Sequence, residues 1–204
     1  MVARPANNSA DSRAATRGRP YGTSSEHDGG ASLEEKSISI DPEKAVGVRA
    51  KLFGQLTSEN RTTLSVIEHA LDDKLDFTPP PKLRPFGPLA LHIYQTGIWF
   101  VNIMESGKVE PSGTGKKPVS PRKKNDLIAR CEGLNREVAN RVNALTPESL
   151  ARLIEFPGVG PFPTVTYLGW HVNHMIHHRG QLTVYLRLMG AKVPPVYGPT
   201  LDYP

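Results

Sequence analysis

The stretch that decides the fold lies near the end of the 204-residue chain and reads WHVNHMIHHRGQ, residues 170–181. It belongs to a longer run, about 164–189, in which apolar residues recur with helical spacing. One stripe of that run is apolar throughout: Leu168, Val172, Met175, Leu182 and Met189. The neighbouring stripe, spaced alternately by four and three residues, is Tyr167, His171, His174, His178, Gln181, Tyr185 and Leu188. This side of the helix is predicted to face a core.

Three histidines and a glutamine therefore occupy positions where a helical bundle usually carries leucine. Burying imidazoles without partners costs free energy, and one remedy that satisfies several at once is a metal ion. His174 and His178 have the i, i+4 spacing of two ligands on one helix face. Since His171 and His178 are two turns, about 10.5 Å, apart along the axis, we do not expect all three to bind one ion.

Three more helices are predicted upstream. The first begins at Asp41-Pro42, an N-cap followed by proline at the first helical position, and runs to about residue 71. The second covers about 86–105 and the third about 120–145. The Gly/Pro-rich stretch 156–163 is predicted to be an irregular crossing before the last helix. Without convincing strand alternation, this pattern predicts an all-α fold, a four-helix bundle with long crossing connections.

The second helix supplies a further histidine at a core position. Its inner stripe is Leu89, His92, Thr96, Trp99 and Ile103. With His174 and His178, His92 would give three imidazoles plus open positions, the pattern of a catalytic metal site. Such a set suits Zn, Ni, Fe or Cu, and ligand type alone does not choose among them. The candidates for hydrogen bonds that orient the imidazoles are Asn60, Thr96, His171, Gln181 and Tyr185.

Two further inner stripes are predicted. That of the first helix is Phe53, Leu56, Asn60, Leu64, Ile67 and Leu71. That of the third is Leu127, Cys131, Leu134, Val138, Val142 and Leu145, which makes Cys131 a core residue rather than a nucleophile. His69 is expected on the solvent side without a role. Arg179 lies off the histidine stripe and is expected in an ion pair, on the surface or between helices. Gly180 is interpreted as a close approach of helices.

Composition indicates two parts. Residues 1–40 are rich in Ser, Ala, Gly and Arg and are predicted to be a disordered tail, and residues 41–204 form the helical domain. The net charge of +5 comes from the loop region 107–130, with seven basic and two acidic residues. A solvated loop is the favoured interpretation, since no nucleic-acid motif accompanies it. The other interpretation is nucleic-acid binding through this loop, which predicts a salt-dependent affinity. The stretch 113–117 lacks the spacing of a phosphate-binding loop.

Other sequence features concern the cellular setting. The single cysteine excludes an internal disulfide framework and is compatible with a reducing compartment. No apolar run reaches the about 18 residues of a membrane span. The N-terminus lacks the apolar core of a secretory signal. A cytoplasmic location without membrane or nucleic-acid partners is therefore predicted.

The block His174-x-x-x-His178-Arg179-Gly180-Gln181, followed by Leu186-Arg187 and Gly190, resembles the C-terminal signature of the DinB/YfiT-like metalloprotein family. The segment 86–92, with Trp99, resembles the second-helix histidine segment of that family. The resemblance covers about residues 42–200. It implies a four-helix bundle, often dimeric, that holds a divalent metal (Zn, Ni or Fe) through His92, His174 and His178.

Characterised members of the family include S-transferases and isomerases that use low-molecular-weight thiols. The resemblance therefore implies a metal-dependent transferase that joins a thiol cosubstrate to a small electrophilic substrate. The same ion could activate water, so a hydrolase is open as well. A third reading, from another class, is a non-catalytic metal-binding or stress-response module, because fold alone does not fix function.

Overall fold

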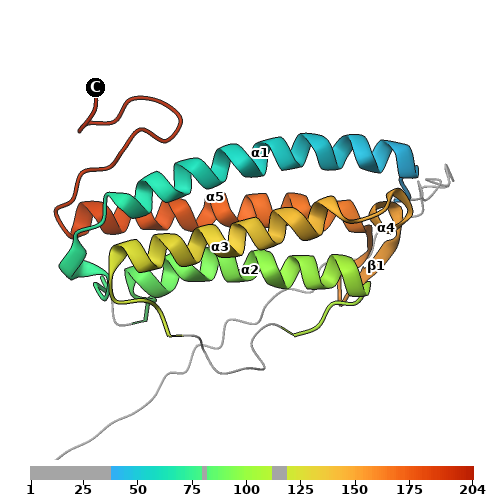
Figure 1. Ribbon diagram of the computed structural model, residues 1–204, viewed down its shortest axis with the longest axis horizontal. Coiled ribbons are helices and arrows are strands. Elements are labelled where there is room, and N and C mark those ends of the chain that lie inside the picture. Colours follow the sequence, from blue (N-terminus) through green and yellow to red (C-terminus); the bar gives the residue numbers. More distant parts are fainter. Residues whose placement is uncertain (1–37, 80–81, 112–118) are drawn as a thin grey trace, which may run out of the picture. The chain divides into compact units, whose positions relative to one another are not determined.

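The computed structural model describes residues 38–79, 82–111 and 119–204. The predicted tail therefore lies outside the described residues except for its last three, and so does the stretch 113–117. Within the described part, four long helices run side by side: α1 (Pro42–Glu68), α2 (Phe86–Ser106), α3 (Lys124–Asn143) and α5 (Thr164–Leu188) (Figure 1). The predicted four-helix bundle is confirmed. No helix in this part of the chain is both long and apolar enough to cross a membrane.

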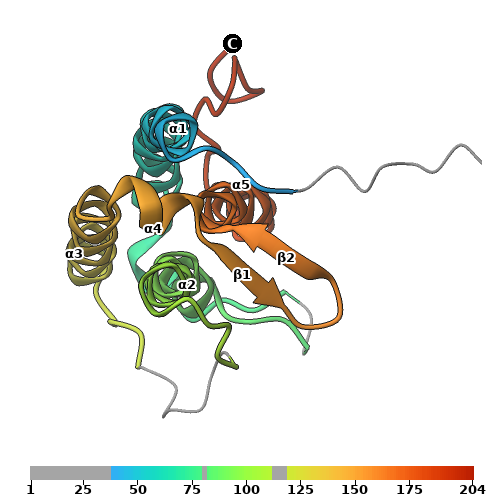
Figure 2. The same cartoon turned by 90° about the vertical axis from the view of Figure 1, so that its right-hand side faces the viewer.

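The helices pack as a square when viewed from the end of the bundle. α5 packs against α1 and α2, and α3 closes the other side against the same two helices (Figure 2). Short elements fill the connections: the 3-10 helix η1 (Asp72–Lys74), the short helix α4 (Pro147–Ala151), and strands β1 (Leu153–Phe156) and β2 (Gly160–Pro163). As predicted, Asp41 caps α1, and its carboxylate accepts from the N–H groups of Glu43 and Lys44 at 2.9 and 3.3 Å.

The stretch 156–163 is not irregular, so that prediction was wrong. β1 and β2 form an antiparallel hairpin in which Leu153 pairs with Pro163 and Phe156 with Gly160. The rings of Phe156 and Phe162 pack on Trp170 of α5, with centroids 5.4 and 5.1 Å apart. Two strands of only four residues, the second of them with two prolines, give too little alternation to recognise.

Most predicted core stripes are buried. The apolar stripe of α5 is buried throughout, and so are the five α3 residues from Leu127 to Val142, including Cys131. Burial raises the pKa of the Cys131 thiol to about 12, which keeps it protonated. The α1 stripe was partly wrong, because Glu59 and Thr63 are buried while Leu71 lies beyond the helix end and is exposed. Leu188, at the end of α5, is exposed as well.

His69 does have a partner, contrary to the prediction. Its ring is half-buried at the end of α1, where Nδ1 bonds the Ser65 carbonyl at 2.7 Å and Nε2 contacts the Tyr203 hydroxyl at 3.2 Å. The residue therefore helps to hold the C-terminal segment against α1.

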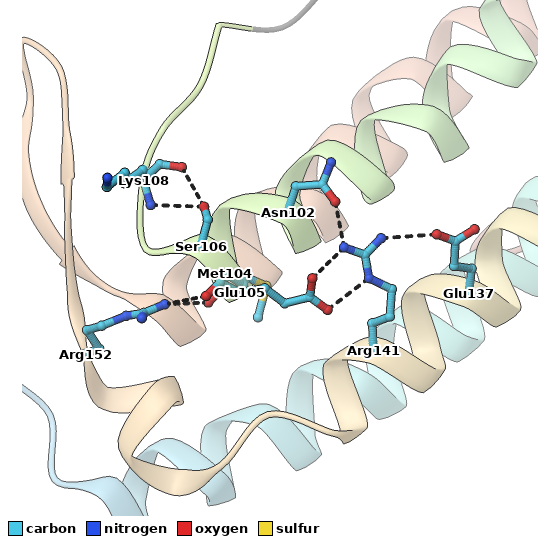
Figure 3. Close-up of polar contacts among 8 residues, drawn as sticks. All are labelled: Asn102, Met104, Glu105, Ser106, Lys108, Glu137, Arg141 and Arg152. Carbon is cyan, nitrogen blue, oxygen red and sulfur yellow. Dashed lines mark hydrogen bonds and ion pairs between the residues drawn. The ribbon is translucent and has the colours of Figure 1, made fainter.

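Two arginines fix the C-terminal end of α2 (Figure 3). Arg141 of α3 forms an ion pair with Glu105 at 2.6 Å and donates to the amide oxygen of Asn102 at 2.6 Å. Arg152 donates to the carbonyls of Met104 and Glu105 at 2.8 and 3.1 Å. The last carbonyls of a helix have no partner within that helix, and the bonds from Arg152 satisfy two of them. The side-chain bonds from Arg141 tie the same end of α2 to α3.

Candidate metal centre

Three histidines from two adjacent helices converge on one point. His92 lies in the first half of α2, and His174 and His178 lie one turn apart in α5. The ring centroids are 5.0 Å apart for His92 and each of the other two, and 4.3 Å apart for His174 and His178. One nitrogen of each ring lies within 4.8 Å of the others. Small rotations of the rings would bring all three to one ion at the usual distance of about 2.1 Å.

Hydrogen bonds to the outer ring nitrogens orient two of these imidazoles. Nδ1 of His178 lies 2.7 Å from Oε1 of Gln181, a pure acceptor, so Nδ1 must donate. The Thr96 hydroxyl lies 3.3 Å from Nδ1 of His92 and donates its single proton to the His92 carbonyl at 2.9 Å. The hydroxyl oxygen therefore accepts from Nδ1. In both rings Nε2 keeps the lone pair that a metal needs.

The three rings are neutral at physiological pH. Burial, then the charges of Arg84 and His178, lowers the pKa of His92 to about 4. Burial and the neighbouring histidines lower the pKa of His174 to about 3. Burial also lowers the pKa of His178, with smaller contributions from His177 and Arg84. No acidic group is among the charges that shift these three pKa values.

The residues fit a metal ion. Nδ1 of His174 is buried and has no hydrogen-bond partner among the described residues. Burying ring nitrogens without partners costs free energy, and a bound cation would offset that cost for those nitrogens that coordinate it. Three neutral imidazole donors with no carboxylate ligand suit Zn, Ni or Fe better than Mg or Ca.

The remaining predicted residues lie as follows. His171 is buried over Gly97 of α2, and it is not in the group of three ligand atoms. The Tyr185 hydroxyl donates to the Arg84 carbonyl at 3.0 Å rather than to an imidazole. Asn60 has a buried amide oxygen without a partner among the described residues, so no bond joins it to the histidines.

The close approach of helices occurs at Gly97, which sequence reasoning missed, and not at Gly180. A Cβ at position 97 would lie 2.7 Å from Cε1 of His171, whereas a Cβ at position 180 would meet nothing within 4 Å. Nothing local in the sequence separates these two helical glycines.

Gly97→Ala is therefore expected to lower the free energy of unfolding by about 1–3 kcal/mol, because the buried His171 ring must shift. The matched control is Gly180→Ala, which should stabilise the protein by about 0.5–1 kcal/mol, the usual gain from removing a glycine inside a helix. Urea unfolding of both variants measures this, and equal stability of the two would contradict it.

Arg179 is buried in an ion pair between helices. Of the two predicted alternatives, the surface position was therefore wrong and the pair between helices was right. Its side chain is 2% exposed, and it pairs with Glu59 of α1 at 2.5 Å. Tyr197, from the C-terminal segment, accepts from Arg179 at 2.5 Å and donates to Glu59 at 2.9 Å. Sequence reasoning missed both partners. This network ties the helix that carries His178 to α1.

A helical bundle whose facing helices bring three imidazoles together defines a class of proteins that can hold a metal ion in the bundle core. The chain belongs to the DinB family, whose model matches residues 43–204. The solved structure of a DinB-like protein of Bacillus subtilis, YjoA, superposes with a TM-score of 0.61 at 23% identity, covering 72% of this chain and 98% of that one. A DinB-like protein of Bacillus cereus gives a TM-score of 0.60 at 24% identity, covering 72% and 95%.

One curated relative is similar in sequence over a shorter stretch. The uncharacterized protein YrdA of Bacillus subtilis is 41% identical over 57 residues, which are 28% of this chain and 34% of that protein. The match thus spans about a third of the relative.

Proposed function

We propose that this protein is a metal-dependent enzyme of the thiol S-transferase kind, which acts on a small electrophilic substrate. Hydrolysis is the other reaction that the same residues allow. The observation that carries the proposal is the convergence of His92, His174 and His178, with ligand nitrogens within 4.8 Å of one another. The homodimer and the cytoplasmic location stay predictions.

The donor set supports a catalytic rather than a structural role for the ion. Three protein ligands leave coordination positions for a cosubstrate, whereas structural zinc sites are closed by four. The three rings are only partly buried, so the cluster is reachable from solvent. When bound, a divalent ion supplies Lewis acidity, which lowers the pKa of a thiol or of water and favours the nucleophilic anion.

The residues of the chain bind and orient. Gln181 and Thr96 hold two rings with their Nε2 lone pairs free. The buried Phe100 ring packs near His174, with centroids 6.4 Å apart. His92, His174 and His178 would hold the ion through neutral donors, two of them oriented by these hydrogen bonds.

Metal content tests the proposal. The protein purified from cells, or reconstituted with Zn, Ni or Fe, is expected to hold about one ion per chain by elemental analysis. His92→Ala and His178→Ala should each lose the ion, because two imidazoles bind far more weakly than three. The matched control is His177→Ala: His177 is exposed, adjacent to His178 and outside the group of three.

The outcomes separate the possibilities. Full occupancy that survives His92→Ala would overturn the assignment across helices. No metal in the native or reconstituted protein would make the three histidines core residues and would remove the basis for the enzyme. A metal-loaded protein that turns over no electrophile with any thiol, and hydrolyses none, would leave a non-catalytic metal-binding module.

A further inference from the structure

A cationic side chain extends from the start of α2, the helix that carries His92. Arg84 directly precedes Pro85, the N-cap residue of α2, and its side chain is exposed. It makes no hydrogen bond or ion pair with any residue in the described part of the chain. By contrast, Arg141, Arg152 and Arg179 are all held by bonds to neighbouring helices.

The backbone of Arg84 is fixed at this place. The hydroxyl of Tyr185, seven residues after His178 on α5, donates to the Arg84 carbonyl at 3.0 Å. Two residues further on, the N–H of Phe86 bonds the Phe77 carbonyl at 3.0 Å, and the N–H of Gly87 bonds that of Leu75 at 2.7 Å. The side chain therefore extends from a rigid point rather than from a free loop.

The backbone of Arg84 lies at the end of the three-histidine cluster that faces the start of α2. Side chains on a helix tilt toward its N-terminus, so His92 leans toward the start of α2, where Arg84 lies. Arg84 lies eight residues before His92, and its carbonyl is bonded to Tyr185, which lies seven residues after His178. Its backbone is therefore roughly two helical turns from one histidine on each helix, a span that an extended arginine side chain can largely bridge.

Charge at the centre is not balanced by the protein. The group of ligand atoms found among the described residues consists of three imidazoles and no carboxylate, so it would leave both positive charges of a divalent ion uncompensated. Arg84 adds another positive charge. Such a site favours an anionic ligand, and a guanidinium binds carboxylates through two parallel hydrogen bonds.

We propose that Arg84 determines ligand specificity by binding the carboxylate of a small ligand whose other end binds at the three-histidine centre. The ligand class is a small thiol that carries a carboxylate. This inference rests on the proposed function, because it requires metal at His92, His174 and His178. It adds which cosubstrates the centre prefers and which residue selects them.

Matched thiols test the inference on metal-loaded protein. Dissociation constants are measured by calorimetry for mercaptoacetate, mercaptopropionate and mercaptobutyrate, and for the neutral amide of each. The series varies the distance between thiol and carboxylate, and each amide keeps the shape without the charge. Metal content is determined on every sample, so that a failure of the proposed function is recognised separately.

In the wild-type protein at least one acid is expected to bind about tenfold more tightly than its amide, the effect of a charge-assisted hydrogen-bonded pair. Arg84→Gln should remove that preference while metal content is unchanged, and Arg84→Lys should retain part of it. The control is Arg61→Gln. Arg61 is an exposed residue of α1 whose side chain makes no hydrogen bond or ion pair with the described residues.

Each other result overturns the inference. If the acids bind no better than their amides, or if Arg84→Gln keeps the preference, Arg84 does not select the ligand. If no thiol binds a protein that does hold metal, the ligand class is wrong and the metal site remains. A protein that takes up no metal overturns the proposed function and this inference together.

Discussion

Replacing Arg179 by methionine is expected to lower the free energy of unfolding by about 3–5 kcal/mol, the usual effect of breaking a buried ion pair from one side. Arg179 is 1% exposed, and its partner Glu59 is 7% exposed. Methionine can fill much of the space, but it leaves the Glu59 carboxylate without its cation between α1 and α5. The Tyr197 hydroxyl, which donates to that carboxylate at 2.9 Å, does not neutralise the charge.

A double variant separates loss of the pair from loss of packing. Arg179→Met combined with Glu59→Leu removes both charges, and such replacements are often close to neutral. The double variant should therefore be more stable than Arg179→Met alone. Urea unfolding of the wild-type protein, both single variants and the double variant gives the coupling energy. An Arg179→Met variant within about 1 kcal/mol of the wild type would contradict the prediction.

Helix positions were predictable because local chemistry determines them. Asp41-Pro42 starts α1 through the capping bonds that its sequence indicates. The apolar stripe of α5 and the stripe of α3 around Cys131 are buried where helical periodicity places them. A period of 3.6 residues is a property of each helix alone, so it can be recognised without knowledge of the partners.

The errors arose where distant residues decide the structure. Glu59 is not in the predicted inner stripe of α1, because its burial depends on pairing with Arg179, 120 positions later in the chain. Gly97 gains its meaning from the His171 ring that packs over it. The hairpin 153–163 depends on packing of Phe156 and Phe162 against Trp170.

The candidate site depends both on local sequence signals and on contacts between distant residues. The spacing of His174 and His178 is local and indicates a shared helix face. Their convergence with His92 depends on how α2 packs against α5, and the core position of His92 and the family signature allowed that expectation. Arg84 carries no local signal, because a surface arginine before a proline is unremarkable until the fold places it beside the imidazoles.

Acid is expected to destabilise the metal-free protein strongly below about pH 6.5, because its buried histidines resist protonation. In the folded state the pKa of His171 is lowered to about 4, that of His92 to about 4 and that of His174 to about 3. The unfolded chain therefore binds protons that the folded chain does not. The stability is complete above pH 6.5, the ordinary histidine pKa, and is lost as the pH falls toward about 4.

His171 allows the size of this effect to be tested at one residue. Its ring is 2% exposed, burial alone lowers its pKa, and the shift from 6.5 to about 4 corresponds to about 3 kcal/mol. Urea unfolding in the presence of a chelator, from about pH 7 down to about pH 4, should show the loss. His171→Leu removes one titrating group, so its unfolding free energy should fall less steeply with pH, whatever its stability at neutral pH. Identical slopes for the variant and the wild type would mean that the His171 ring gains a proton in the folded state, which its burial over Gly97 without a partner for Nδ1 opposes.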